Sequence, residues 1–86
     1  MRIDMLLNKL CLTKTRSIAK QACDKNLVWI NGKPAKASHE IKAGDHIRLH
    51  LYGFKHELEI LQIPLGNVPK QDTTKYYTML EKTALD

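Results

Sequence analysis

The dipeptide Asn31-Gly32 constrains the fold of this 86-residue chain more than any other feature of its sequence. A two-residue hairpin turn of type I′ needs positive φ at both central residues, and Asn-Gly adopts that conformation with little strain. The segments on either side, residues 27–30 and 33–37, have the length of short strands. The sequence therefore predicts an antiparallel β-hairpin over residues 27–37.

An apolar stripe close to the N-terminus predicts a first helix. Four aliphatic residues follow the i, i+3, i+4, i+7 spacing of a buried helix face: Ile3, Leu6, Leu7 and Leu10. Asp4 suits the N-cap position, because its carboxylate can accept a hydrogen bond from a free backbone N–H. We therefore expect a helix over residues 5–12, with its apolar face toward the core.

A second helix is predicted over residues 16–25. Its apolar face is formed by small and branched side chains: Ile18, Ala19, Ala22 and Cys23. Either Thr13 or Thr15 can cap its start. Asn26 suits the left-handed residue that often ends a helix.

The rest of the chain reads mostly as strands and turns. Residues 42–45 predict a turn, and residues 46–51 and 55–63 predict two strands joined at Tyr52-Gly53. Residues 64–74 contain two prolines and a glycine and are predicted to be a loop. The tail, residues 75–85, fits either a strand or a helical turn. The predicted class is α+β, with short N-terminal helices packed on a small, mostly antiparallel sheet.

The excess positive charge lies in one part of the chain. Seven basic residues and one acidic residue fall between Lys9 and Lys36, a net charge of +6 where the whole chain carries +5. A basic segment of this kind favours a polyanionic partner.

Several other classes of function are not favoured. No apolar run approaches the roughly 20 residues that a membrane span needs, so we expect a cytoplasmic protein without membrane contact. The sequence has no catalytic or nucleotide-binding motif, and we expect neither an enzyme nor a cofactor. His46 and His50 would lie about 13 Å apart along a strand, too far to share a metal ion. Cys23 is predicted to be a buried, reduced thiol.

The order of motifs resembles the S-four-type RNA-binding domain, also called the alpha-L motif. The resemblance covers about residues 1–51 and rests on four segments: Arg2-Ile3-Asp4, Lys14-Thr15-Arg16-Ser17-x-Ala19, Val28-x-Ile30-Asn31-Gly32 and Ile41-Lys42-x-Gly44-Asp45-x-Ile47. The chain departs from the family at Asn26, where glycine is common, and at Trp29, which is unusual in the first strand. Lys14-Thr15-Arg16 and Lys36-Ala37-Ser38 resemble the stand-alone ribosome-associated group that includes heat-shock protein fifteen and its short Gram-positive counterpart.

This resemblance implies one S-four-type domain over residues 1–86, with a motif core at 1–51 and added strands and a tail at 52–86. It also implies binding to the large ribosomal subunit that carries a stalled peptidyl-tRNA, with contacts to ribosomal RNA and tRNA. The implied role is rescue or quality control of stalled nascent chains, with a nascent-chain quality-control protein as a further partner. We expect a monomer that catalyses no reaction.

Some of the residues predicted to contact RNA lie around the start of the second helix, where backbone N–H groups and the helix dipole favour a phosphate. Lys33 and Lys36 extend from the hairpin, where Asn31 and Lys33 can reach an RNA backbone or base edge. Arg16 leads the prediction, because its planar guanidinium can hold a phosphate through two hydrogen bonds. The full predicted set is Arg2, Lys9, Lys14, Thr15, Arg16, Lys20, Asn31, Lys33 and Lys36.

Structural roles compete with RNA contact at some positions. Arg2 and Asp4 suit an ion pair that fixes the first helix, Asn31-Gly32 suits turn formation, and Asp45 suits a turn. Trp29 fits either stacking on a base or packing in the core or against a partner.

Two other functions remain open from the sequence. One is a general binder of structured RNA or a ribosome assembly factor. The other is a helix-turn-helix DNA binder, since two short helices open the chain.

Overall fold

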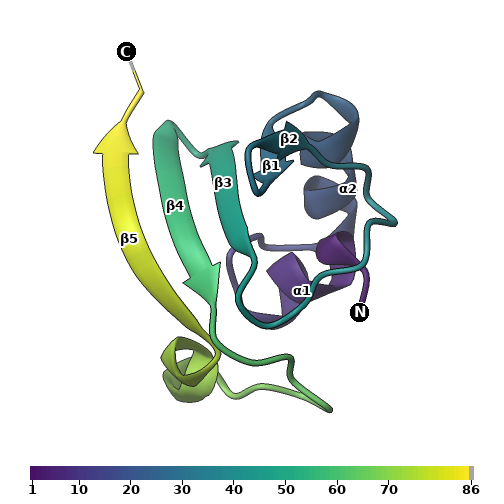
Figure 1. Ribbon diagram of the computed structural model, residues 1–86, viewed down its shortest axis with the longest axis vertical. Coiled ribbons are helices and arrows are strands. Elements are labelled where there is room, and N and C mark those ends of the chain that lie inside the picture. Colours follow the sequence, from purple (N-terminus) through teal and green to yellow (C-terminus); the bar gives the residue numbers. More distant parts are fainter. Residues whose placement is uncertain (86) are drawn as a thin grey trace.

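A five-stranded antiparallel sheet with two N-terminal helices forms the fold, in a computed structural model that describes residues 1–85 (Figure 1). The strand order is β2-β1-β3-β4-β5. The elements are α1 (Ile3–Lys9), α2 (Arg16–Asp24), β1 (Val28–Ile30), β2 (Lys33–Pro34), β3 (His46–Leu51), β4 (Phe54–Ile60), the 3₁₀ helix η1 (Lys70–Lys75) and β5 (Tyr77–Ala84). The predicted α+β class is confirmed.

Helix α1 begins earlier and ends earlier than predicted. Asp4 is not its N-cap: Arg2 holds that position and makes no side-chain capping bond. The first N–H groups of the helix are satisfied by a distant segment instead, because Ile3 N donates to the carbonyl of His39 (2.8 Å) and Asp4 N to that of Ala37 (3.3 Å). The helix stops at Lys9, and Cys11 adopts a left-handed φ of 59°.

Helix α2 matches its prediction to within one residue. Thr15 is the cap, and its Oγ1 accepts a hydrogen bond from Ile18 N (3.1 Å). Thr13 is buried instead, and its hydroxyl donates to the carbonyl of Thr15 (2.9 Å). Asn26 has the expected left-handed φ, 60°.

The predicted hairpin is present, with φ of 52° at Asn31 and 85° at Gly32. Its return strand is shorter than the expected 33–37, since β2 contains only Lys33 and Pro34. Beyond Pro34 one further hydrogen bond, from Ala35 N to the carbonyl of Val28 (2.9 Å), holds the chain to β1, and the carbonyl of Ala37 then accepts from the start of α1. The hairpin thereby joins the sheet to the N-terminus.

The C-terminal half resolves the alternatives left open by the sequence. Strand β3 has its predicted bounds, β4 ends at Ile60 rather than at residue 63, and the tail forms β5. The stretch predicted as a loop contains η1, which follows Pro69 and is fixed by a hydrogen bond from the buried Thr73 hydroxyl to the Lys70 carbonyl (3.1 Å). Strand β4 ends at Ile60. The next two backbone N–H groups, of Leu61 and Gln62, both donate to the carbonyl of Tyr76, so the regular ladder with β5 does not continue.

The core lies between the helices and one face of β1, β3 and β4. The predicted apolar stripe of the first helix is buried in it: Ile3, Leu6, Leu7 and Leu10. The strands contribute alternating side chains: Val28, Ile47, Leu49, Leu58 and Ile60. Strand β5 is largely exposed on both faces and pairs only with β4, so the β4–β5 strand pair extends beyond the helices (Figure 1).

Cys23 belongs to this core at 3% exposure, as predicted. Burial, with Asp4 and Asp24 nearby, raises the pKa of its thiol to about 11. The thiol therefore stays protonated at neutral pH and acts as a small apolar side chain.

Candidate nucleic-acid interface

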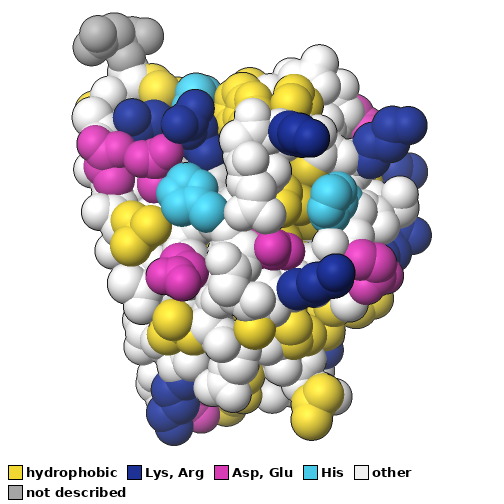
Figure 2. Space-filling view, in the orientation of Figure 1, with side chains coloured by type: hydrophobic (Ala, Val, Ile, Leu, Met, Phe, Trp, Pro, Cys, Tyr) yellow, Lys and Arg dark blue, Asp and Glu magenta, His cyan; other side chains and the backbone are white. Residues whose placement is uncertain are grey.

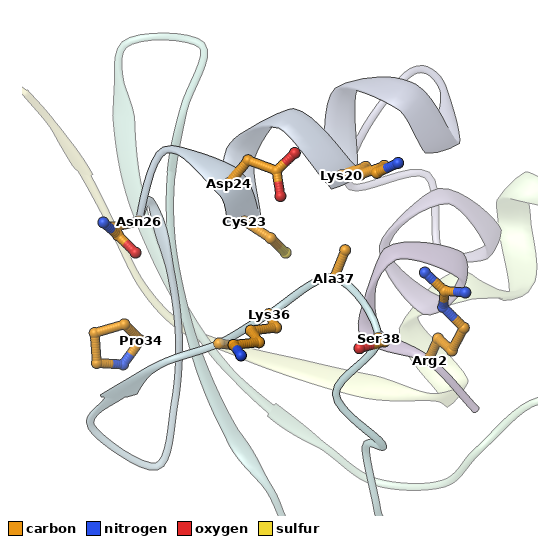
Figure 3. A pocket seen from close by; sticks show the side chains of 10 residues that line it. Arg2, Lys20, Cys23, Asp24, Asn26, Pro34, Lys36, Ala37 and Ser38 are labelled. Atoms are coloured by element: carbon orange, nitrogen blue, oxygen red, sulfur yellow. The ribbon is translucent and has the colours of Figure 1, made fainter.

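A groove runs between α2 and the segment that follows β2. Figure 3 shows Lys20 and Asp24 on the helix side, Pro34, Lys36 and Ser38 on the opposite side, and Arg2 at one end. The groove holds about 600 Å³, and its lining contains three cations and one carboxylate. It is therefore a positively charged channel beside a helix.

Asp4 organises the cations at the end of this groove. Its carboxylate is 1% exposed, and its Oδ2 lies 3.2 Å from Arg2 Nη2 and 3.4 Å from Arg16 Nε. A buried carboxylate needs such partners to offset its lost hydration. Both arginine side chains remain nearly half exposed, at 42% and 47%, so each guanidinium keeps N–H groups free for a phosphate.

The start of α2 lies next to this arginine pair. A smaller hollow of about 310 Å³ is lined by Arg2, Asp4, Arg16, Ser17 and Lys20. The first turn of α2 contains no acidic residue, so the positive end of the helix dipole reinforces the two guanidinium groups. An anion in this hollow would meet two arginines, a lysine and a helix N-terminus, with the Asp4 carboxylate already paired to both arginines.

Four of the predicted RNA-contacting residues are brought together here: Arg2, Arg16, Lys20 and Lys36. In Figure 2, several Lys and Arg side chains lie along the right-hand edge, on the side where α2 lies, with some acidic side chains beside them. The predicted pair of Arg2 with Asp4 is confirmed, and the second partner, Arg16, was not predicted.

The other predicted residues lie elsewhere or serve local structure. Lys9 Nζ donates to the carbonyl of Gly66 (3.1 Å), and the hydroxyl of Thr15 caps α2. Lys14 faces a different groove, with its ammonium 5.8 Å from the centre of the Tyr52 ring. Lys33 is exposed at the hairpin.

Asn31 stabilises the hairpin through its side chain. Its Nδ2 donates to Asp45 Oδ1 (3.1 Å), and its Oδ1 accepts from His46 N (2.9 Å). Asp45 also accepts from Lys42 N (2.8 Å), which confirms its predicted role in a turn. Both polar atoms of the Asn31 side chain are therefore hydrogen-bonded within the protein.

Trp29 lies outside the core, so of the alternatives that the sequence left open, packing in the core is not the one observed, and stacking on a base or contact with a partner stays open. It is half-buried on the sheet face opposite the helices, because its neighbours Val28 and Ile30 point inward. Its ring lies 4.6 Å from that of His50 and 5.9 Å from the guanidinium of Arg48. Alternation in a three-residue strand was the signal for this orientation.

Residues 1–85 contain neither a candidate metal site nor a candidate membrane-spanning helix. No group of three His, Cys, Asp or Glu side chains is placed to hold a metal ion, and no helix is long and apolar enough to cross a membrane.

Comparison with known proteins identifies the family. Residues 1–47 match the family model described as S4 domain. The chain belongs to the S4 domain family. This membership confirms the resemblance seen in the sequence motifs, and the match covers α1, α2, the β1–β2 hairpin and the start of β3.

Whole-length relatives and a solved structure agree with this membership. The chain is 51% identical over 77 residues to the RQC P-site tRNA stabilizing factor of Helicobacter pylori, covering 88% of this chain and 92% of the relative. It is 32% identical to the protein of the same name in Bacillus subtilis, covering 99% and 98%. Its fold is similar to that of the trimeric heat shock protein 15 of Vibrio cholerae, with a TM-score of 0.86 and 25% identity over 92% of this chain and 80% of that one.

Proposed function

We propose that this protein binds RNA on the large ribosomal subunit and stabilises tRNA in the P site during ribosome quality control. The observation that carries the proposal is the arginine pair, Arg2 and Arg16, held by buried Asp4 at the start of α2. The names of the whole-length relatives supply the ribosomal setting.

The arginine pair suits the backbone of structured RNA. Duplex RNA hides its base edges in a deep, narrow major groove, so proteins contact its phosphates and 2′-hydroxyls. Two guanidinium groups fixed by one carboxylate present a preformed phosphate site, which lowers the entropy lost on binding. Lys20 and Lys36, on the two sides of the groove in Figure 3, would extend the contact along the strand.

We further propose which residues contact RNA. Arg2, Arg16, Lys20 and Lys36 form the centre of the set, and the full set is Arg2, Lys9, Lys14, Thr15, Arg16, Lys20, Asn31, Lys33 and Lys36. Residues 1–86 act as one domain, as a cytoplasmic monomer without catalytic activity, in contact with ribosomal RNA, tRNA and a nascent-chain quality-control protein.

Sucrose-gradient sedimentation of the tagged protein tests this function. We expect wild-type protein to migrate with free large subunits and the double variant Arg16→Gln/Lys20→Gln to remain at the top. Glutamine is preferable to glutamate at position 16, because a second carboxylate beside Asp4 would destabilise the fold.

The matched control is Lys42→Gln/Lys55→Gln, which removes the same charge from residues outside both hollows of this interface. Normal co-sedimentation of the Arg16→Gln/Lys20→Gln variant would refute the site. Absence of the wild-type protein from every large-subunit fraction, with binding to isolated RNA intact, would favour a general RNA binder.

A further inference from the structure

A second groove lies between the α1–α2 connection and the β4–β5 strand pair. It holds about 630 Å³ and shares no lining residue with the groove beside α2. Its lining includes three lysines, Lys14, Lys70 and Lys82, and no acidic residue. None of these lysines lies within 4.0 Å of a carboxylate among residues 1–85. The groove therefore favours an anionic occupant.

Aromatic rings accompany these lysines. Tyr52, His56 and Tyr77 line the same groove, and the ammonium of Lys82 lies 4.8 Å from the centre of the neighbouring Phe54 ring. Tyr52 is 49% exposed, so its ring is accessible. Cations that follow a phosphate backbone, combined with rings on which bases stack, are typical of surfaces that bind unpaired nucleic acid.

The backbone at Tyr52 supports a role for its ring. Tyr52 and Gly53 form the β3–β4 turn with φ of 55° and 79°. A bulky residue at positive φ is strained, and Asn or Gly is the ordinary choice at the first position. The phenol oxygen accepts a hydrogen bond from Lys14 N (3.1 Å), which holds the hydroxyl end of the ring against the α1–α2 connection. The chain thus keeps an aromatic side chain where the turn itself disfavours one.

We propose that this groove is a second RNA-binding surface, which takes an unpaired RNA segment with a base stacked on Tyr52 and phosphates beside Lys14, Lys70 and Lys82. The inference rests on the proposed RNA-binding function and adds a separate surface to it. A single molecule would then hold two RNA segments, a structured one at α2 and an unpaired one at the β4–β5 strand pair.

Fluorescence anisotropy with labelled oligouridine tests the stacking. Tyr52→Asn suits the left-handed turn and removes the ring, and it should weaken binding about five-fold or more. Tyr52→Phe keeps the ring and loses only the bond from Lys14 N, and it should stay within about two-fold of wild type. Thermal unfolding of both variants verifies that they fold.

Salt dependence tests the lysines. Lys70→Gln/Lys82→Gln should reduce the slope of log affinity against log salt by about 0.7 per lysine. The charge-matched control, Lys42→Gln/Lys55→Gln, should leave that slope unchanged, because neither residue lines the groove. An equal reduction in the control would overturn the assignment.

The two surfaces can fail independently. Arg16→Gln belongs to the interface beside α2 and is judged by sedimentation, whereas Tyr52→Asn, compared with Tyr52→Phe, is judged by oligouridine affinity. No measurable oligouridine binding by wild type at low salt, or unchanged affinity in Tyr52→Asn, overturns the second surface whatever the gradients show. Loss of large-subunit association in Tyr52→Asn with full RNA affinity would identify a protein-docking groove and also overturn it.

Discussion

At the scale of single residues, Asp4 connects the stability of the fold to the proposed RNA contact. Its buried carboxylate lies against Arg2 and Arg16, and its Oδ1 accepts from Met5 N at 2.8 Å. Asp4→Asn should lower the free energy of unfolding by about 1–2 kcal/mol, since two charge-assisted contacts are lost but the half-exposed guanidinium groups regain hydration. Urea unfolding measures the change. Asp24→Asn, at an exposed residue of the same interface, should change stability little, and equal stability of the two variants would contradict the role of Asp4.

The two cysteines should react very differently. Cys11 is exposed, whereas Cys23 is buried with its thiol pKa raised from 9.0 to about 11. At pH 8 a thiol-specific disulfide reagent should modify one thiol rapidly, and Cys11→Ser should abolish that fast phase. Above pH 9 the unfolded chain loses the Cys23 proton while the folded chain keeps it, so stability should fall as pH rises from about 9 to 11. Rapid modification of both thiols in the native protein would contradict the burial of Cys23.

At the scale of elements, the sequence was informative where structure is determined locally. The Asn31-Gly32 turn, the start of α2 at Arg16 and the bounds of β3 follow from turn chemistry, capping and alternation. The start of α1 was missed, because its first N–H groups bond to carbonyls of Ala37 and His39, more than thirty residues away. No local pattern contains such a contact.

In the candidate interface, too, the sequence predicts the features that are determined locally and misses the contacts that need the folded chain. The importance of Arg16 follows from its place at a helix start, but its contact with Asp4 needs two helices packed together. Lys14 was grouped with Arg16 because they are neighbours in sequence. In the folded protein, the bond from Lys14 N to the Tyr52 hydroxyl directs that residue into the other groove, with Lys70 and Lys82 from the C-terminal half.

At the scale of the whole molecule, the basic segment over residues 9–36 supplies Lys20 and Lys36 to the groove beside α2 but only Lys14 to the second groove, whose other two lysines come from the C-terminal half. The groove beside α2 is formed by the S4 core, and the second groove depends on β5 and η1, which lie beyond the residues matched by the family model. The added C-terminal strand therefore does more than enlarge the sheet, since it supplies Lys82 and Tyr77 to the second groove.

Cryo-electron microscopy of the large subunit bound to this protein and a P-site tRNA would show which face of the protein contacts RNA. We predict that Arg2, Arg16 and the start of α2 contact RNA phosphates, with Lys20 and Lys36 along the same strand. A bound protein whose α2 groove faces solvent or another protein, with RNA contacted only elsewhere, would contradict it.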